Sequence, residues 1–345
     1  MHSDSVFAKN LKACNNFRLY DGNAAVYELK SLDMDNLLLQ NDLLRHNMVV
    51  FTDGRTALQT LPALVDVIPE AKLNLAIYHL RNGDCEEAEA LLEDCEPVTP
   101  AELILKGVVK ATMGQMQGNL KSIREAQSYF EAVGKSPTEA DTIPGRHSMA
   151  SALFLDQEFD DANVYLSSIK NFSADDDDFN WNYGISLSRC GDWVAGEETL
   201  LKVQNPSYKS DIHYCAWLAR CQIRNGKADS AWGMYPSIDE TNRVYFLKVI
   251  AEDCFRAQRF LVAARAFDCL QRLDDDIDYT LGLRSSCIGV FRFLVVEKFI
   301  NDKISIKNKN SLSEAIEILQ GHLNVDELKK ILITFKQWMK KNIAK

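Results

Sequence analysis

The sequence predicts an all-α protein built of repeated helix pairs, and three observations predict it. Only 8 Pro and 16 Gly occur among 345 residues, fewer than a loop-rich β protein usually carries. Small residues recur at a mean spacing of 34 residues. A large apolar residue follows each of them by four positions, on the same face of a helix. A single helix pair cannot bury such an apolar stripe, so we expect neighbouring pairs to stack into a solenoid.

The recurring small residue lies in the second helix of each predicted pair and sets the register. It occurs at Ala25, Ala57, Ala88, Ala126, Ala162, Gly196, Ala231 and Ala263. The apolar residues four positions later are Leu29, Leu61, Leu92, Phe130, Leu166, Leu200, Tyr235 and Phe267. Twelve positions earlier a further small residue lies in the first helix: Ala13, Ala76, Gly114, Ala150, Gly184, Ala219 and Ala251. The second repeat is the exception, with Arg45 at this position.

This registered triple is the tetratricopeptide-repeat signature, and it predicts a right-handed superhelical solenoid. The alternative is an irregular all-α domain in which the spacing arises by chance. Glycines at the predicted turns between paired helices favour the repeat: Gly22, Gly54, Gly83, Gly191 and Gly226. The longest step, 38 residues, is explained by an inserted loop at Gly114–Asn119. In that repeat we expect Gly107 to be the small residue of the first helix, with Gly114 matching by coincidence.

The pattern divides the chain into residues 1–300, with about eight helix pairs, and residues 301–345, with a polar linker and C-terminal amphipathic capping helices. A capping box at Ser311–Glu314 predicts the start of a helix. An apolar stripe then predicts a cap for the open end of the solenoid: Leu328, Ile331, Leu332, Phe335, Trp338 and Met339. Residues 298–345 carry ten lysines against five acidic residues, which we interpret as the solvated face of this cap. The alternative is a contact with acidic tubulin tails or a membrane surface.

Composition excludes several classes of function. The formal charge of −10 argues against nucleic acid as a partner, since phosphate binding needs a strongly positive face. No apolar run approaches the roughly 20 residues that span a bilayer, so we expect no membrane insertion. Nine cysteines without a C-x-x-C pair indicate reduced, packed thiols of a cytosolic protein.

No catalytic, cofactor-binding or metal-binding motif stands out, so we predict that the chain is not an enzyme and holds no cofactor. The six histidines are isolated, and both the glycine-rich phosphate loops and the serine-hydrolase elbow are absent. We interpret Cys215 and Cys221 as packed thiols. The carboxylates of Asp175–Asp178 are interpreted as a solvated loop that caps the next helix, since the run lacks the glycine and distal glutamate of a calcium loop.

One pattern predicts a binding surface. In tetratricopeptide arrays the first helix of each pair lines the groove, and that face should carry Trp181, Arg189, Arg220, Arg224, Lys248 and Arg256, with His147 and His213 nearby. Guanidinium groups pair with carboxylates in bidentate fashion, so such a groove favours an acidic peptide. The alternative is that these cations neutralise neighbours such as Asp178, Asp192, Glu252 and Asp253.

Several strings are specific to one family rather than to tetratricopeptide repeats in general. They are NLKACNNFRLYDG (10–22), RHNMVVF (45–51), LPALVDVIPEAKLNLAIYHLRNGD (61–84), EPVTPAELILKGVV (96–109), DTIPGRHSMAS (141–151), WLARC (217–221) and AFDCLQRLD (266–274). Together they resemble the intraflagellar transport protein 56 family, also called tetratricopeptide repeat protein 26. The resemblance runs from about Asn10 to Trp338. Members carry further repeats N-terminal to the point matching Asn10, so the sequence corresponds to the C-terminal portion of such a protein and is expected to be either a fragment of a longer chain or a short form that has lost those repeats.

The resemblance implies an adaptor without catalysis, assembled with other subunits of the intraflagellar transport B complex. It implies a place in the cilium or flagellum, at the ciliary base and in the cytoplasm, with ciliary motility proteins as cargo. A co-chaperone that clamps a carboxylate is a second hypothesis, with Lys12, Asn16, Asn74, Lys106 and Lys110 as residue types that do not fall in consecutive repeats. A third is the helical subunit of an enzyme such as a prenyltransferase.

Overall fold

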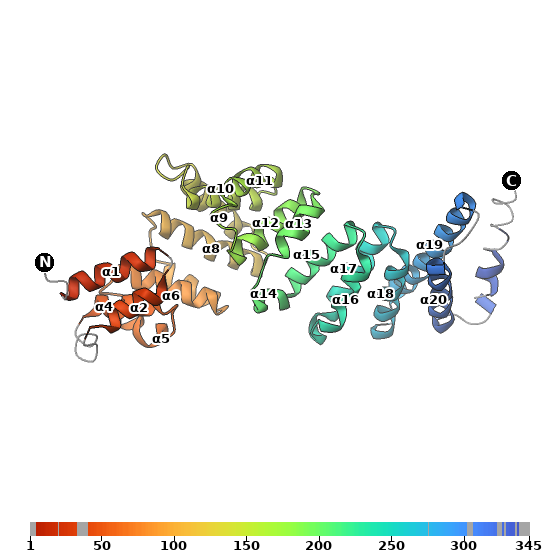
Figure 1. The fold of residues 1–345 in the computed structure, drawn as a ribbon, viewed down its shortest axis with the longest axis horizontal. Coiled ribbons are helices and arrows are strands. Elements are labelled where there is room, and N and C mark those ends of the chain that lie inside the picture. The colour runs from red at the N-terminus through yellow and green to blue at the C-terminus, as the bar shows by residue number, and fades with distance from the viewer. Residues whose placement is uncertain are drawn as a thin grey trace. The chain divides into compact units, whose positions relative to one another are not determined.

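The computed structural model describes residues 5–19, 21–32, 41–274, 276–301, 306–322, 326–327, 329–334 and 337. The chain divides into two compact units, Met1–Ile169 (unit 1) and Lys170–Lys345 (unit 2). Within the described ranges every regular element is helical and no strand occurs (Figure 1). The prediction of an all-α repeat fold is therefore confirmed, while the division of the chain at residue 300 and the handedness of the superhelix stay predictions.

Unit 1 is a series of antiparallel helix pairs joined by short turns. Its helices are α1 (Val6–Arg18), α2 (Gly22–Lys30), α4 (Asp42–Phe51), α5 (Ala57–Thr60), the 3-10 helix η1 (Pro62–Leu64), α6 (Pro69–Arg81), α7 (Cys85–Leu92), α8 (Pro100–Gln117), α9 (Leu120–Gly134), α10 (Ile143–Leu155) and α11 (Phe159–Ile169). Side-chain caps start several of these helices. At α8 the Thr99 hydroxyl and the Glu102 carboxylate form a capping box around the first turn.

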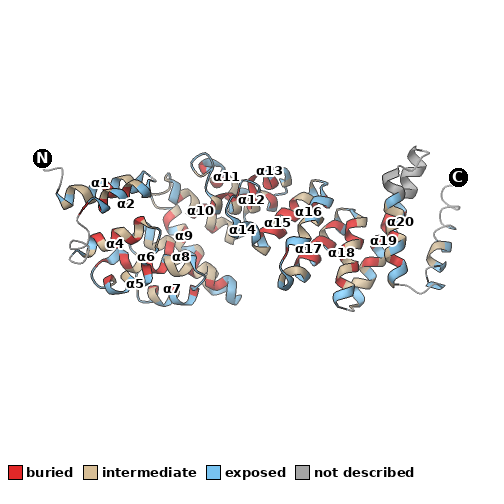
Figure 2. Cartoon of the chain, turned by 60° about the horizontal axis from the view of Figure 1, so that its bottom comes forward, coloured by how far each residue is buried: buried red, intermediate tan, exposed pale blue. Residues whose placement is uncertain are grey.

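Unit 2 continues the same alternation of first and second helices. Its elements are α12 (Asp177–Arg189), α13 (Trp193–Leu200), α14 (Pro206–Ser210), α15 (Ile212–Arg224), α16 (Ala228–Met234), the 3-10 helices η2 (Tyr235–Ser237) and η3 (Glu240–Asn242), α17 (Arg243–Arg256), α18 (Phe260–Leu273), α19 (Ile277–Asn301) and α20 (Ile306–His322). In Figure 2 the buried residues lie where the helices of each unit face one another.

The small residues that set the register are all buried in the structure. Those of the second helices, from Ala25 to Ala263, are at most 1% exposed where they are alanines, and Gly196 is buried as well. The glycines show why no larger side chain fits. A Cβ atom on Gly184 would lie 2.7 Å from Cγ of Leu200, and one on Gly196 would lie 2.3 Å from Oγ of Ser188. The repeat spacing therefore records close helix–helix contact.

The predicted inserted loop at Gly114–Asn119 is wrong for most of its length. Helix α8 continues through Gln117 and ends at Gly118, which adopts the left-handed conformation with φ 64°. Both glycines of α8 pack on α9: a Cβ atom on Gly107 would meet the ring of Phe130 at 2.7 Å, and one on Gly114 would meet Cγ1 of Ile123 at 2.8 Å. The match at Gly114 is therefore no coincidence, because the extra residues lengthen two packed helices.

The predicted glycine turns are present with one change. Gly54, Gly83, Gly191 and Gly226 have φ between 79° and 89°, a region that only glycine adopts without strain. Gly22 differs because it is the first residue of α2, whose N-cap is the preceding aspartate.

The C-terminal helices differ from the prediction in where they begin. Helix α20 starts at Ile306, so Ser311 lies inside it, and the predicted capping box does not open a helix. Ala315 and Leu319 of α20 are buried in one cluster with Leu283 and Phe291 of α19. Of the predicted C-terminal stripe, Leu332 packs against this cluster and Ile331 is half-buried. The other members lie outside the described residues: Leu328, Phe335, Trp338 and Met339.

Candidate partner-binding face of unit 2

The first helices of unit 2 lie side by side and run in the same direction. Near their starts, the ring of Trp181 on α12 meets the ring of Tyr214 on α15 edge-on at 5.8 Å. Near their ends, the Ser188 hydroxyl and the Cys221 thiol of the same two helices are hydrogen-bonded at 3.0 Å. Both contacts join residues 33 positions apart, which requires parallel helices. Parallel first helices present one continuous face along unit 2.

Two contacts extend this face from α15 to α17. The ring of His213 packs edge-on against Tyr245 at 6.0 Å. Nε of Arg220 donates a hydrogen bond to Asp253 at 3.1 Å, and the two side chains are 30% and 13% exposed. The guanidinium of Arg220 also lies over the Trp217 ring, 4.9 Å from its centroid. Arg220 is thus largely committed to contacts within the protein.

Arg224 and Lys248 are exposed and rest on aromatic rings. The Arg224 guanidinium lies 5.4 Å from the centre of the Trp193 ring, and the Lys248 ammonium lies 5.7 Å from that of Tyr279. Hydrogen bonding to Tyr279 raises the pKa of Lys248, and the negative charges of the nearby Asp276 and Asp274 raise it further. Within the described ranges neither cation forms an ion pair. Cation–π contact holds such groups in place while leaving one side open to a ligand.

The remaining predicted groove residues have three different environments. Arg256 pairs with Glu252 at 3.5 Å, one helical turn away. Arg189 is exposed at the C-terminal end of α12, where the helix dipole favours a cation. Trp181 is half-buried and packs its ring on Tyr208 at 5.1 Å. All six predicted residues therefore lie on first helices, and five of them are cations. Two of these cations, Arg220 and Arg256, pair with Asp253 and Glu252, which the alternative interpretation named.

The two histidines predicted near this set lie in different units. His213 lies on the face, against Tyr245, whereas His147 lies on α10 of unit 1. Sequence reasoning missed the aromatic partners of the cations: Trp193, Trp217 and Tyr279. Trp217 could have been found, because it lies three residues before Arg220 on the same helix face. The other two come from different helices, so only the fold brings them to their cations.

The acidic run before α12 organises the local fold. Asp176 accepts a hydrogen bond from the Phe179 backbone and caps α12, as predicted. Asp177 accepts the backbone N–H groups of Gln204 and Asn205 at 2.8 and 2.7 Å. Asp178 accepts the Tyr208 hydroxyl, which raises the pKa of Tyr208 to about 12. These carboxylates fasten the loop after α13 to the start of α12.

Four described thiols of unit 2 are buried, as predicted for Cys215 and Cys221, whereas the predicted packing is wrong for Cys190, which is exposed directly after α12. Burial raises the pKa of both Cys215 and Cys221. Burial raises the pKa of Cys254 and of Cys287 to about 12. A thiolate is the reactive form of cysteine, so these side chains are chemically quiet at neutral pH.

The described part of the chain contains neither a cluster of metal ligands nor a membrane-spanning helix. No three His, Cys, Asp or Glu side chains there lie close enough together to hold a metal ion. None of the helices there has both the length and the apolar character needed to cross a bilayer.

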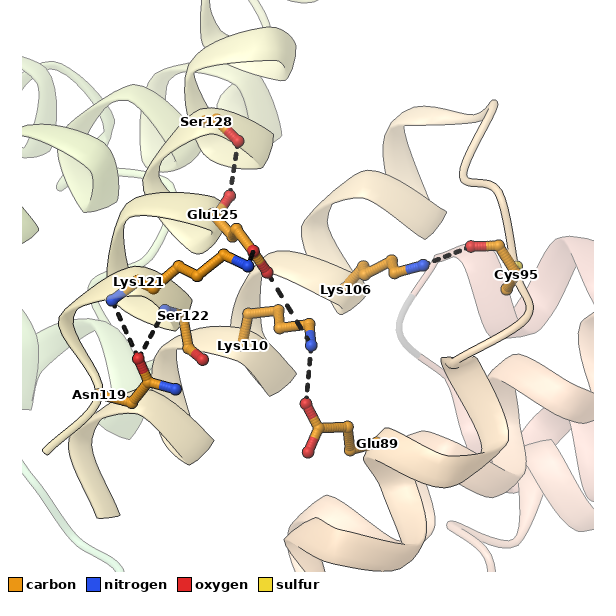
Figure 3. A network of polar contacts seen from close by, with 9 residues as sticks. All are labelled: Glu89, Cys95, Lys106, Lys110, Asn119, Lys121, Ser122, Glu125 and Ser128. Carbon is orange, nitrogen blue, oxygen red and sulfur yellow. Dashed lines mark hydrogen bonds and ion pairs between the residues drawn. The ribbon is translucent and has the colours of Figure 1, made fainter. Parts of the chain in front are cut away.

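In unit 1 the residue types of the carboxylate clamp make internal contacts. Lys12 forms an ion pair with Glu28 at 2.5 Å, and the Asn74 amide is hydrogen-bonded to Nε2 of His46 at 2.9 Å. Figure 3 shows Lys110 directed toward glutamates on both sides and Lys106 directed toward the carbonyl of Cys95. Asn16 lies on α1 and is half-buried. These contacts give no support to a clamp.

Comparison with known proteins identifies the family. The family described as "Intraflagellar transport protein 56" matches residues 1–345. The chain belongs to the intraflagellar transport protein 56 family. A curated relative, the intraflagellar transport protein 56 homolog of Caenorhabditis elegans, is 33% identical over 360 aligned residues, which cover 99% of this chain. The chain spans 62% of the length of that relative.

Among solved structures, similarity is weak. A circular tandem repeat protein with novel repeat topology is 13% identical, with a TM-score of 0.26 over 98% of this chain and 73% of that protein. A chain of the Naa15/Naa10 complex bound to HypK-THB is 12% identical, with a TM-score of 0.25 over 98% of this chain and 66% of that one. These scores are too low to carry an argument, so the fold of this family member rests on its own helix pairs.

Proposed function

We propose that the chain is a non-catalytic scaffold or adaptor subunit of the intraflagellar transport B complex. In this role it supports cilium assembly and the transport of ciliary motility proteins along the axoneme. Its partners are other subunits of the complex and motility cargo, without nucleic acid and without membrane insertion. It acts in the cilium or flagellum, at the ciliary base and in the cytoplasm. The observation that carries this proposal is the family match over residues 1–345.

The architecture supports an adaptor role. Stacked helix pairs bury their apolar stripes against neighbours and expose long rows of side chains, which suit extended protein partners. In unit 2 the first helices form such a row, and its polar groups are held by neighbours rather than gathered in a pocket. The burial of Cys254 and Cys287 likewise supports a structural rather than a chemical role for these two cysteines.

A replacement experiment tests the proposal. In worms, the matching part of the C. elegans homolog is exchanged for this chain, fused to a fluorescent protein. We expect the hybrid to move along the axoneme, to co-purify with other B-complex subunits and to restore cilium length in a strain lacking the homolog. A hybrid that is expressed and folded but stays out of cilia would refute the proposal. A hybrid whose exchanged segment has its residues in scrambled order is the control.

We further propose that the first-helix face of unit 2 binds an acidic peptide, which is the form that the alternative of a peptide-binding adaptor takes here. The predicted contacts are Trp181, Arg189, Arg220, Arg224, Lys248 and Arg256. Arg224 supports this proposal most directly, because it is exposed, is held on Trp193 and forms no ion pair within the described ranges. Arg220 supports it least, because Asp253 already occupies its guanidinium.

Charge reversal separates these two arginines. We expect Arg224→Glu to weaken the binding of a fluorescein-labelled peptide of alternating Glu and Leu about tenfold without lowering the thermal midpoint. Arg220→Glu should lower the midpoint as well, because it leaves the mostly buried Asp253 facing a second carboxylate. Peptide binding that is unchanged by Arg224→Glu would remove the acidic-peptide proposal and leave the ciliary role untouched.

A further inference from the structure

A cavity of about 480 Å³ opens in unit 1 between α7 and α8. Its floor is apolar, since Leu92 is 3% exposed and Val109 is 1% exposed. Its wall carries Glu86 and Glu89 of α7 and Glu93, the C-cap of that helix, at intervals of three and four residues. The volume lies within the range of about 300–1,000 Å³ that is typical of ligand pockets. A space that is open to solvent on one side, with an apolar floor and a carboxylate wall, can hold a side chain that is both long and charged.

The lysines that also line the cavity are already engaged. Nζ of Lys110 donates a hydrogen bond to Glu89 at 2.8 Å and lies 4.0 Å from Glu125 (Figure 3). The hydrogen bond to Glu89 raises the pKa of Lys110, so the ammonium persists and its charge is offset. Lys106 donates to the backbone carbonyl of Cys95. The charge of Lys110 is therefore offset by its glutamates, whereas Lys106 keeps its charge, and the three glutamates and two lysines of the lining leave a net charge of −1.

Two carboxylates of the wall remain uncompensated. Within the described ranges Glu86 and Glu93 form no ion pair, and both are exposed toward solvent. The surroundings strengthen the negative potential, because residues 84–102 contain eight acidic residues and no lysine or arginine. Unit 1 as a whole has 25 acidic residues against 14 basic ones. A cationic group entering the cavity would meet a net negative charge in the lining, in the surrounding segment and in unit 1 as a whole.

We propose that this cavity binds an arginine side chain presented by a basic segment of a partner protein, with apolar residues flanking the arginine. The aliphatic part of the side chain packs on Leu92 and Val109, and the guanidinium reaches Glu86 or Glu93. An arginine stem buries well on apolar surface, and its planar head forms paired hydrogen bonds with carboxylates. The proposal concerns a different face and the opposite ligand charge from the acidic-peptide proposal, and it does not depend on the ciliary role.

The test uses the full chain and two fluorescein-labelled probe peptides, acetyl-Gly-Leu-Arg-Leu-Gly-amide and the same peptide with uncharged citrulline in place of arginine. We expect fluorescence polarisation to show at least tenfold tighter binding of the arginine peptide. The double variant Glu86→Gln/Glu93→Gln should lose about tenfold for the arginine peptide and nothing for the citrulline peptide. Glu87→Gln is the matched control, since it removes a charge from the same helix without lining the cavity.

Ala90→Phe tests the cavity itself. Ala90 lines the space and is exposed, so a phenyl group there fills the cavity while every charge is retained. We expect this variant to keep the thermal midpoint and to lose the arginine peptide about tenfold. Equal binding of the two peptides would overturn the proposal. So would full binding by Ala90→Phe, or an equal loss with Glu87→Gln, since either result would mean that general acidity attracts the probe.

Discussion

Units 1 and 2 use the same repeat but differ in charge and in the continuity of their cores. Unit 1 has 25 acidic residues against 14 basic ones, whereas unit 2 has 24 against 25. In unit 1 the described buried clusters each span one or two neighbouring helix pairs, for example the cluster around Phe130. In unit 2 one cluster runs from Leu200 to Leu270 and joins α13, α15, α16, α17 and α18.

From this comparison we expect the same helix-pair architecture to unfold with different cooperativity in the two units. A core made of separate clusters behaves as a row of nearest-neighbour contacts, so each pair can open with little effect on distant pairs. A continuous core couples its helices, so damage at one position spreads. The acidic excess of unit 1 agrees with the proposal of a cationic ligand there, whereas the proposal of an acidic ligand for unit 2 rests on the cations of its first helices.

The largest expected effect is from truncating the centre of the continuous core. Phe246 is fully buried, and Phe246→Ala should lower the free energy of unfolding by about 3–5 kcal/mol, the usual cost of emptying such a site. Hydrogen exchange should rise across α15 to α18 together. In unit 1, Phe130→Ala should cost a similar amount but raise exchange mainly in α8 and α9. Exchange that stays local in both variants would contradict the difference in cooperativity.

The next largest expected effect is that alkaline pH lowers the stability of unit 2 more than that of unit 1. Burial raises the pKa of Cys254, Cys287 and Tyr214 in unit 2 to about 12, from ordinary values of 9.0 for the thiols and 10.0 for the phenol. The folded state therefore holds these protons more tightly than the unfolded state. The resulting stability is fully present below about pH 9 and is lost as the pH rises toward 12. Cys14 and Lys110 add a smaller effect of the same sign in unit 1.

Tryptophan fluorescence measures this effect in unit 2 alone, because all five tryptophans lie in residues 170–345. Between pH 8 and pH 10.5 the urea midpoint from fluorescence should fall more than the midpoint from circular dichroism at 222 nm, which reports both units. Equal shifts by the two probes would show that the buried thiols and phenols do not distinguish the units.

A smaller effect, similar in size in the two units, should come from glycines at which the first helix of a pair packs against the second. A Cβ atom on Gly107 would lie 2.7 Å from the Phe130 ring, and one on Gly184 would lie 2.7 Å from Leu200. Each Gly→Ala variant should lose about 1–3 kcal/mol by overpacking. Similar losses in thermal melts would confirm that both units use one type of contact. A neutral result at either glycine would mean that its partner side chain moves aside freely.

The smallest expected effect is a gain. Gly233 lies inside α16 with ordinary helical φ, and nothing lies within 4 Å of a Cβ atom built there. Gly233→Ala should therefore stabilise unit 2 by about 0.5–1 kcal/mol through helix propensity. A small upward shift of the urea midpoint by fluorescence would confirm that the losses at Gly107 and Gly184 come from packing rather than from alanine itself.

The sequence predicted which helices carry the groove cations, but not which side chains those cations contact. The helical register correctly placed Arg220, Arg224, Lys248 and Arg256 on first helices, because positions repeat every three to four residues along a helix. Sequence reasoning named Asp253 among the possible acidic neighbours, but it could not decide that Asp253 would pair with Arg220 while Trp193 supports Arg224. These partners lie about 30 residues away and depend on how neighbouring pairs stack.

The positions of some helix ends likewise could not be predicted from the local sequence. The stretch Gly114–Asn119 and the serine motif Ser311–Glu314 both carry local signals for interruption, yet α8 runs to Gln117 and α20 starts at Ile306. In both helices packing outweighs the local preference: Gly114 contacts α9, and Ala315 and Leu319 are buried against α19. Burying an apolar face contributes more than the loss of one good cap.

Local sequence was sufficient to specify the helix pairs, their register and the family. Close helix contact tolerates only small side chains, and that requirement leaves a periodic record along the chain. Tertiary structure alone decided which charges are neutralised, where the aromatic rings support cations and where the cavity beside α7 opens. Those outcomes depend on distances between side chains of neighbouring repeats, and electrostatic energies change steeply over the few ångströms that separate a paired charge from a free one.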